Sequence, residues 1–322
     1  RARFGFARAT ADWRELVADP AVELVSITTP NVLHKEMALA ALAAGKHVWC
    51  EKPLAMTAGD AQELARAAAA AGKVTLVGYN YLRSPALIFA QQLLRAGELG
   101  PVTQFRAIFD EDFMGPAEFP FSWRCATAQA GTGALGDMGS HLVNLAHALV
   151  GPIVEVAAVL HTAIGERRDA QGRLRRVEND DVAEVLLRFA DGAVGHLGCS
   201  RIAWGRKNGI DIEIYGRQGG LRFTQERFNE IQLFKPAERA DDNGFRTILT
   251  GPPHPPFGRF TPGWGHGLGF NDLKVIEAAH LLEAIAGGTP AWPDFAEGHQ
   301  VELVCEAIAR SAETRRWERV EA

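Results

Sequence analysis

Three side chains of this sequence combine useful chemistry with informative positions. Lys52 follows a short apolar run and precedes a proline, where a chain turns sharply. Asp137 and His141 are four residues apart, so on a helix they share one face near its N-terminus, where the helix dipole favours a carboxylate. An imidazole can take a proton near neutral pH, and an ammonium can stabilise charge that develops on an oxygen. These residue types favour proton-transfer chemistry.

The same residues also have structural interpretations, which the sequence leaves open. Asp137 is typical of a helix N-cap, His141 of a buried core histidine and Lys52 of a solvated surface charge. Trp123 and Arg124 could wall a ligand pocket or belong to the core.

Several other polar residues carry weaker signals. His266 stands in a glycine-rich loop, so it could reach a ligand or lie exposed at the loop tip. His147 is off the helical face of His141 and is interpreted as structural. The run 131–136 matches G-x-G-x-x-G, but no strand is predicted before it, so it is not interpreted as a dinucleotide-binding loop. No Ser–His–Asp order or metal-ligand spacing stands out, and no metal is expected. Two acidic pairs are interpreted as solvated turn charges: Asp180-Asp181 and Asp241-Asp242.

The first hundred residues alternate strand and helix patterns, which predicts a parallel sheet with right-handed crossovers. In such sheets, ligands bind at the carboxyl ends of the strands. Three polar segments follow the strands and meet at that edge: Thr28–Asn31, Glu51–Pro53 and Gly78–Tyr81. The predicted strands are Glu23–Thr28, Lys46–Cys50 and Val74–Val77. The predicted helices are Thr10–Asp19, His34–Ala44, a segment capped by Thr57 and ending at Ala71, and Ala86–Ala96 with Ser84 as its N-cap.

After about residue 100 the pattern changes to consecutive alternating strands, which predicts a largely antiparallel sheet. The fold class is therefore α/β, a partial Rossmann sheet over 1–100 followed by an α+β domain over 101–322. Two final helices, Asp272–Ala286 and Glu297–Arg315, are expected to pack back on the first domain. The Gly- and Pro-rich segment Asp241–Gly269 is predicted to be a functional or oligomer-bracing loop. The predicted strands are Pro101–Asp110, Val154–Ala163, Asp181–Phe189, Ala193–Arg201, Gly209–Tyr215 and Gly220–Phe223.

Composition narrows the class of protein. The chain has 322 residues with 34 Lys and Arg against 39 Asp and Glu, a net charge of −5 that argues against a nucleic-acid partner. No apolar run is long enough to cross a bilayer, so no membrane partner is expected. Four scattered cysteines favour a reducing, cytoplasmic setting. The sequence begins with Arg1 rather than methionine, and we expect that the natural chain starts upstream.

Taken together, the motifs resemble those of the glucose–fructose oxidoreductase, inositol dehydrogenase and rhizopine-catabolism family (Gfo/Idh/MocA). The likeness runs from about residue 10 to the end, in the order and spacing of that family. The matching segments are Thr29-Pro30-Asn31-x-x-His34, Gly45-Lys46-His47-Val48 with Glu51-Lys52-Pro53, Gly78-Tyr79-Asn80-Tyr81, Trp123-Arg124, Gly131 to His141, Pro293-Asp294-Phe295-x-x-Gly298 and Arg310-Ser311-Ala312.

The resemblance implies an NAD- or NADP-dependent enzyme that transfers a hydride between nicotinamide and a secondary hydroxyl of a sugar, anhydrosugar or cyclitol. It implies a homodimer or homotetramer joined through the open sheet, with a small sugar or polyol as substrate. The glycine-rich loop and the residue that selects NAD or NADP would lie before Arg1. By resemblance the catalytic residues are Lys52, Asp137 and His141, with His141 as base. The cofactor residues are Thr28, Thr29, Pro30, Asn31, His34, Glu51, Lys52, Pro53 (after a cis peptide), Asn80, Trp123 and Arg124. The substrate residues expected are Lys52, Asn80, Arg124, Asp137, His141 and His266.

Two other functions remain open at this point. An NAD-dependent glycoside hydrolase of the same fold would carry the same lysine and histidine, and a sensing regulator would have lost catalysis. The run Phe113–Trp123 predicts an aromatic-walled pocket for a pyranose, an anhydrosugar or an inositol.

Overall fold

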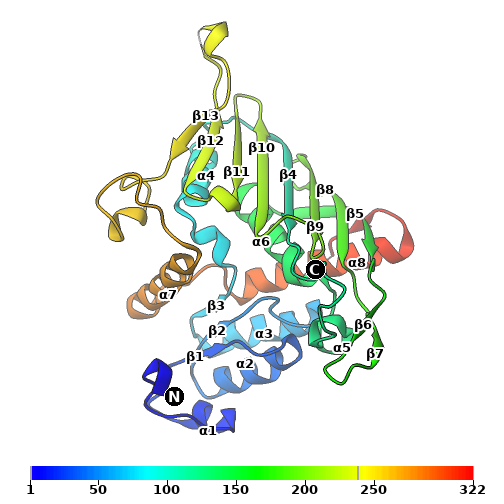
Figure 1. The fold of residues 1–322 in the computed structure, drawn as a ribbon. Helices are drawn as coiled ribbons and strands as arrows, with labels where there is room; N and C mark the ends of the chain where they lie inside the picture. Colours follow the sequence, from blue (N-terminus) through cyan, green and yellow to red (C-terminus); the bar gives the residue numbers. More distant parts are fainter. Residues whose placement is uncertain (1, 238, 322) are drawn as a thin grey trace.

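The computed structural model describes residues 2–237 and 239–321. Within these residues, a small parallel sheet and a large, mostly antiparallel sheet lie at opposite ends of the molecule, with helices between them (Figure 1). This arrangement confirms the predicted fold class. None of the described helices combines the length and apolar character needed to span a membrane.

The small sheet has the order β1-β2-β3, and both strand pairs are parallel. Its helices begin and end near their predicted signals. The Thr57 hydroxyl accepts the Asp60 N–H at the start of α3, and Gly72 ends that helix in the left-handed conformation. The elements are α1 Trp13–Ala18, β1 Leu24–Ile27, α2 His34–Ala43, β2 His47–Cys50, α3 Ala58–Ala71 and β3 Thr75–Val77.

The helix α4, Pro85–Arg95, begins at a proline and has Ser84 as its N-cap residue, both as predicted, but the Ser84 side chain makes no capping hydrogen bond. The Ser84 hydroxyl caps no helical N–H and lies 3.4 Å from the Phe228 carbonyl oxygen. Because Pro85 has no N–H, one backbone group that a cap would satisfy is already absent.

The large sheet has the order β13-β12-β11-β10-β4-β9-β8-β5-β14, in which β4 and β9 pair in parallel. The six predicted strands are confirmed within one or two residues. Its strands are β4 Val102–Asp110, β5 Ile153–His161, β8 Val182–Phe189, β9 Val194–Ser200, β10 Gly209–Gly216, β11 Gly220–Thr224, β12 Glu230–Phe234, β13 Arg246–Leu249 and β14 Glu318–Arg319.

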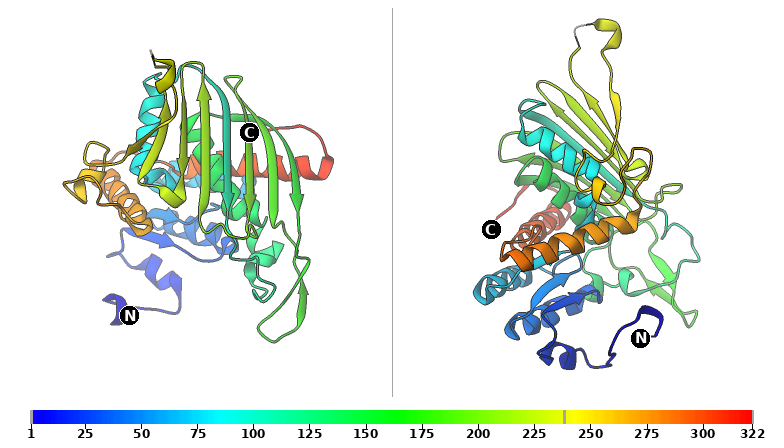
Figure 2. Two further views of the ribbon diagram at one scale, coloured as in Figure 1. Left: turned by 45° about the horizontal axis from the view of Figure 1, so that its top comes forward. Right: turned by 90° about the vertical axis from the view of Figure 1, so that its left-hand side faces the viewer.

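Helices cover one face of the large sheet and leave the other face open (Figure 2). The covering helices include α4, α6 (Ser140–Leu149) and α8 (Phe295–Thr314). The helix α8 also packs on α3 of the small-sheet half, and the Phe295 N–H faces the Thr75 hydroxyl at 3.3 Å. The helix α7, Phe270–Gly287, lies beside the small sheet. The helix α8 therefore bridges both halves, whereas α7 packs on the small sheet.

Some elements escaped prediction because they are short or exposed. The segment Asp241–Gly269 is only partly a loop, since β13 lies inside it and pairs with β12 at the sheet edge. Three of the four β13 residues are exposed, so no apolar alternation marks this strand. A separate hairpin formed by β6, Glu166–Arg168, and β7, Leu174–Arg176, also escaped prediction.

Candidate active site

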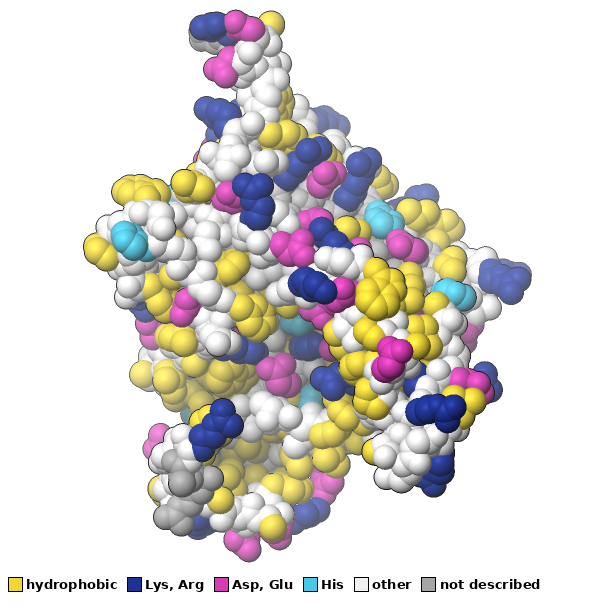
Figure 3. Space-filling model, in the orientation of Figure 1, with side chains coloured by type: hydrophobic (Ala, Val, Ile, Leu, Met, Phe, Trp, Pro, Cys, Tyr) yellow, Lys and Arg dark blue, Asp and Glu magenta, His cyan; other side chains and the backbone are white. Residues whose placement is uncertain are grey.

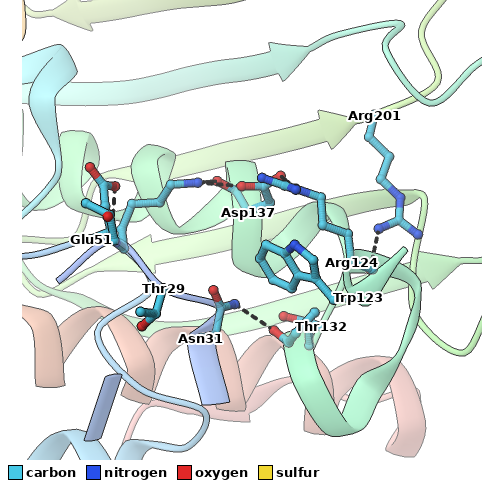
Figure 4. A pocket seen from close by; sticks show the side chains of 12 residues that line it. Thr29, Asn31, Glu51, Trp123, Arg124, Thr132, Asp137 and Arg201 are labelled. Carbon is cyan, nitrogen blue, oxygen red and sulfur yellow. Dashed lines mark hydrogen bonds and ion pairs between the residues drawn. The ribbon is translucent and has the colours of Figure 1, made fainter. Parts of the chain in front are cut away.

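A polar cavity of about 230 Å³ opens at the carboxyl ends of β1 and β2 (Figure 4). Its wall joins the two halves of the chain, because segments after both small-sheet strands face residues between β4 and α6. Eight lining residues were predicted as site residues: Thr28, Thr29, Asn31, Glu51, Lys52, Trp123, Arg124 and Asp137. Four were not predicted: Ala130, Thr132, Gly133 and Arg201.

Lys52 and Asp137 form a close ion pair at the centre of this cavity. The Lys52 ammonium donates to the Asp137 Oδ1 at 2.5 Å and to its backbone oxygen at 2.6 Å. The Arg124 guanidinium lies 3.9 Å from the other carboxylate oxygen. Burial tends to raise the pKa of Asp137, but the two cations outweigh it and lower that pKa below its usual value. Asp137 is therefore an anion, held between two cations.

His141 lies behind this pair, buried among aromatic rings. Its ring centroid is 4.7 Å from that of Tyr81 and 5.4 Å from that of Tyr79. Burial, together with the charges of Lys52 and Lys274, lowers the pKa of His141 well below its usual value. The imidazole is thus neutral near pH 7 and can accept a proton. It does not belong to the lining residues of the cavity itself.

A buried acidic residue holds the loop that carries Asp137. The Asp180 carboxylate accepts the N–H groups of Gly133 at 2.6 Å and Leu135 at 2.8 Å. These groups begin a π-helical turn, Leu135–Gly139, which leads into α6. The first N–H groups of a helix have no partner within it, so a carboxylate placed there stabilises the turn. Asp137 is thereby fixed against Lys52.

The prediction that Asp180 and Asp181 are solvated turn charges is therefore wrong. Both are buried, and Asp181 is paired with the equally buried Arg201 at 2.9 Å. Arg201 also donates to the Asn179 side-chain oxygen at 3.0 Å. This cluster could not be predicted from spacing, because Arg201 follows β9 whereas Asn179, Asp180 and Asp181 precede β8. The other acidic pair, Asp241 and Asp242, is exposed as predicted.

The run 131–136 follows the short helix α5, Thr127–Ala130, and no strand comes directly before it. Rejection of a dinucleotide-loop interpretation is therefore supported. Glycine is needed at position 133 because the Asp180 backbone comes close to it: a Cβ there would lie 1.9 Å from the Asp180 carbonyl oxygen.

His34 links the loops that follow β1 and β2. Its ring nitrogens lie 2.8 Å from the Pro53 carbonyl oxygen and 2.9 Å from the Thr29 carbonyl oxygen, and the side chain is fully buried. Both ring nitrogens of His34 are thus engaged with backbone oxygens of the two loops, and its cofactor contact stays a prediction. Pro30 and Pro53 lie in the two loops but do not line the cavity, and the peptide before Pro53 is cis as expected.

Two amides lie near these loops. The Asn31 amide donates to the Ala130 carbonyl oxygen at 2.9 Å, which ties the first loop to α5 across the cavity. Asn80 is 4% exposed, and its side-chain N–H₂ has no partner among the described residues. A buried donor without a partner is costly, so its presence at the carboxyl end of β3 fits a ligand that accepts from it.

The aromatic wall predicted from Phe113–Trp123 is reduced to Trp123. That ring lines the cavity, with the Arg124 guanidinium 4.5 Å from its centroid. Phe113, Phe119 and Phe121 instead form a small separate core with buried Met114, Cys125 and Val177.

The structure shows the surroundings of two further histidines, His266 and His147. His266 is exposed in its loop, 3.4 Å from the Gly263 carbonyl oxygen, and does not line the cavity, so this chain gives its predicted substrate contact no support. His147 pairs with Glu297 at 3.0 Å, in agreement with a structural role.

Glu111, which was not among the predicted site residues, does not line the cavity but lies close enough to Asp137 and Lys52 to feel their charges. It follows β4 directly, and burial together with the nearby Asp137 charge raises its pKa to about 7. Lys52 opposes this rise only in part. Its position after a strand, next to Asp110, could have indicated a role at the site, because polar residues after the strands of the small sheet were predicted to lie there.

The fold and site match one family. A model of the oxidoreductase family with an NAD-binding Rossmann fold matches residues 1–79, and a Gfo/Idh/MocA C-terminal domain model matches residues 88–222. The chain belongs to the Gfo/Idh/MocA family of oxidoreductases, and its first part is an NAD-binding domain.

Among its relatives is levoglucosan dehydrogenase of Pseudarthrobacter phenanthrenivorans, 40% identical over 98% of this chain and 84% of the relative. A solved structure of levoglucosan dehydrogenase in complex with NADH and levoglucosan has a TM-score of 0.97 and 41% identity, covering 100% of this chain and 86% of that one. An NAD-binding oxidoreductase from Klebsiella pneumoniae has a TM-score of 0.96 and 42% identity, covering 100% and 86%.

Proposed function

We propose that this chain oxidises a secondary hydroxyl of an anhydrosugar or a related pyranose with NAD⁺. The observation that supports this most is the Lys52–Asp137 ion pair, set in a polar cavity at the carboxyl ends of parallel strands. One relative is named levoglucosan dehydrogenase, after an anhydrosugar, and is 40% identical to this chain. A cyclitol is the less favoured substrate on this comparison.

The residues present fit a nicotinamide cofactor. The unpartnered Asn80 amide, at the carboxyl end of β3, can donate to a carbonyl group, and Thr28, Thr29 and Glu51 offer polar atoms that line the cavity. When bound, the nicotinamide ring accepts or returns a hydride. We propose NAD rather than NADP, because solved relatives carry NADH.

Lys52 is proposed to contact the reacting hydroxyl and stabilise the negative charge that develops on its oxygen. Asp137 holds Lys52 in place and can accept a bond from a neighbouring hydroxyl, which fixes the face of the sugar. His141, neutral behind the pair, is proposed to receive the hydroxyl proton. Arg124 and Trp123 form the opposite wall.

A test measures NADH formation at 340 nm with levoglucosan, 1,5-anhydrosugars, glucose and myo-inositol as substrates. The proposal predicts reduction of NAD⁺ with an anhydrosugar or pyranose, and weaker reduction with inositol. Cleavage of a nitrophenyl glycoside without net NADH would instead support the glycoside hydrolase. NADH binding without turnover of any substrate would favour the regulator.

We also propose that the open face of the large sheet joins two or more copies of the chain. Large apolar side chains are exposed there on neighbouring strands, with Val159 67%, Leu186 54% and Val194 49% exposed. This face lies toward the viewer in Figure 3, where apolar and charged side chains are mixed. Light scattering of Leu186→Lys should show a smaller particle than the parent protein. An unchanged mass would contradict this interface.

A further inference from the structure

A further cation, Lys274, approaches the candidate site from α7, far along the chain from the residues that line the cavity. The Lys274 ammonium donates to the Glu51 Oε1 at 2.8 Å and to the Glu277 Oε2 at 2.9 Å. Glu51 lines the cavity directly before Lys52, whereas Glu277 is fully buried inside α7. The lysine thus connects a helix of the C-terminal part with the carboxyl end of β2.

The Glu51 carboxylate is confined on two sides. Its Oε2 lies so close to Gly78 that a Cβ on that residue would be 2.9 Å away, tighter than real Cβ contacts. Lys274 occupies the other side and also stands 5.5 Å from the centroid of the Trp49 ring. The Lys52 N–H faces Glu51 Oε2 at 3.3 Å. The orientation of Glu51 is therefore linked to the backbone of Lys52.

The charges alternate from α7 into the cavity. Glu277, Lys274, Glu51, Lys52, Asp137 and Arg124 are acidic and basic in turn, and each is within 4 Å of the next or adjacent in sequence. Burial tends to lower the pKa of Lys274, but the Glu277 and Glu51 charges outweigh it and raise that pKa. Lys274 is thus a permanent cation with both neighbours fixed, so it is not available to a free anion.

We propose that Lys274 is a positioning residue that fixes the Glu51 carboxylate at the cavity wall and so orders the Glu51–Lys52 segment. This inference deepens the proposed function and rests on it for its kinetic readout. A lysine on α7 can do this only while α7 is docked on the small sheet. Assembly of the cavity wall is therefore tied to packing of the C-terminal part against the NAD-binding part.

The test is a double-mutant cycle with Lys274→Met, Glu51→Gln and both together. Lys274→Met should lower kcat/KM for sugar oxidation at least about 10-fold, and Lys274→Arg should restore part of it. Because Lys274 acts through Glu51, the double variant should lie within about twofold of Glu51→Gln alone. The matched control is Glu283→Gln, which breaks the exposed Arg259–Glu283 pair on the same helix and should leave kcat/KM unchanged.

Loss of Lys274 leaves the buried Glu277 without its partner, so Lys274→Met could fail to fold. The second variant, Lys274→Met with Glu277→Gln, removes that charge and should show the same loss of kcat/KM. The proposal would be overturned if the losses of kcat/KM in Lys274→Met and Glu51→Gln multiplied in the double variant. It would also be overturned if Lys274→Met lowered kcat/KM no more than Glu283→Gln does.

A readout without substrate separates this proposal from the proposed function. The same double-mutant cycle is measured by urea unfolding of the cofactor-free protein. The unfolding constant of the double variant should differ at least about threefold from the value expected if the Lys274 and Glu51 changes acted independently. If no sugar is oxidised but this coupling is found, the proposed function fails and the Lys274–Glu51 contact stands. Absence of coupling would overturn the positioning role whatever the activity.

Discussion

At the scale of single residues, the site depends on charges that the fold forces close together. Lys52 and Asp137 were recognisable from the sequence because each lies at an informative point, the end of a strand and the start of a helix. Asp180 and Arg201 were not, because their roles depend on contacts between segments far apart in the chain. Spacing along a sequence reports neighbours on one element, and it carries no signal for such contacts.

Glu111 gives a residue-scale prediction. With a pKa raised to about 7, its carboxyl is neutral below that pH and charged above it, close to the Lys52–Asp137 pair. The dependence of kcat/KM on pH should therefore contain a step near pH 7 that is missing in Glu111→Gln. The control is Glu118→Gln, an exposed glutamate in the following loop. Identical profiles for Glu111→Gln and the parent protein would contradict this role.

At the scale of elements, the strands and helices of the first hundred residues followed from apolar runs, caps and glycines. The strand β13 and the hairpin of β6 and β7 did not, since exposed strands lack the apolar alternation that burial imposes. The π-helical turn Leu135–Gly139 is likewise invisible to periodicity. It exists because Asp180 satisfies its first N–H groups from a segment more than 40 residues away along the chain.

Gly133→Ala tests the contact between the Asp180 segment and this turn. The added Cβ would lie 1.9 Å from the Asp180 carbonyl oxygen, so the turn or the Asp180 segment must move. We expect a loss of about 3 kcal/mol in unfolding free energy, at the upper end for overpacking. Urea denaturation measures it. Gly165→Ala is the matched control, since a Cβ there meets open space, and it should change stability by less than about 0.5 kcal/mol. Equal midpoints for the two variants would contradict the steric argument.

Glu302 gives a prediction about α8. Burial raises its pKa to about 8, whereas the carboxyl of an unfolded chain ionises near its model value of 4.5. The folded state therefore holds a proton that the unfolded state has lost, so this group destabilises the fold progressively as pH rises from about 4.5 to about 8. Each pKa unit of difference corresponds to about 1.4 kcal/mol, so the difference between about 4.5 and about 8 makes the total on the order of 5 kcal/mol.

Glu302→Gln removes this titration. Its melting temperature, measured at pH 5.5 and pH 8.5, should fall less over that range than the melting temperature of the parent protein. Glu313→Gln, an exposed position on the same helix, should behave like the parent. A Glu302→Gln variant that follows the parent curve at both pH values would contradict the buried, protonated state.

At the scale of the whole molecule, the cavity is shared by two sheets that the sequence could place only as successive patterns. The order of α/β and α+β segments was predictable, and so was a site at the strand ends. Packing of the two final helices on the first domain was also expected, but the particular contacts that join the halves were not: α8 packs on α3 and β5, and Lys274 reaches Glu51. Surface complementarity between distant segments has no counterpart in local periodicity. The candidate active site consequently depends on docking of the two halves.

The most direct test of the account compares turnover with nucleotide binding in Lys52→Ala and His141→Ala. If the two side chains handle charge and proton at the reacting hydroxyl, each change should lower kcat by at least about 100-fold. The dissociation constant for NADH, followed by fluorescence titration, should stay within about threefold of the parent value in both, because neither side chain is assigned the main share of nucleotide affinity. Turnover that is unchanged in either variant, with NADH still bound, would contradict the assignment of this cavity as the active site.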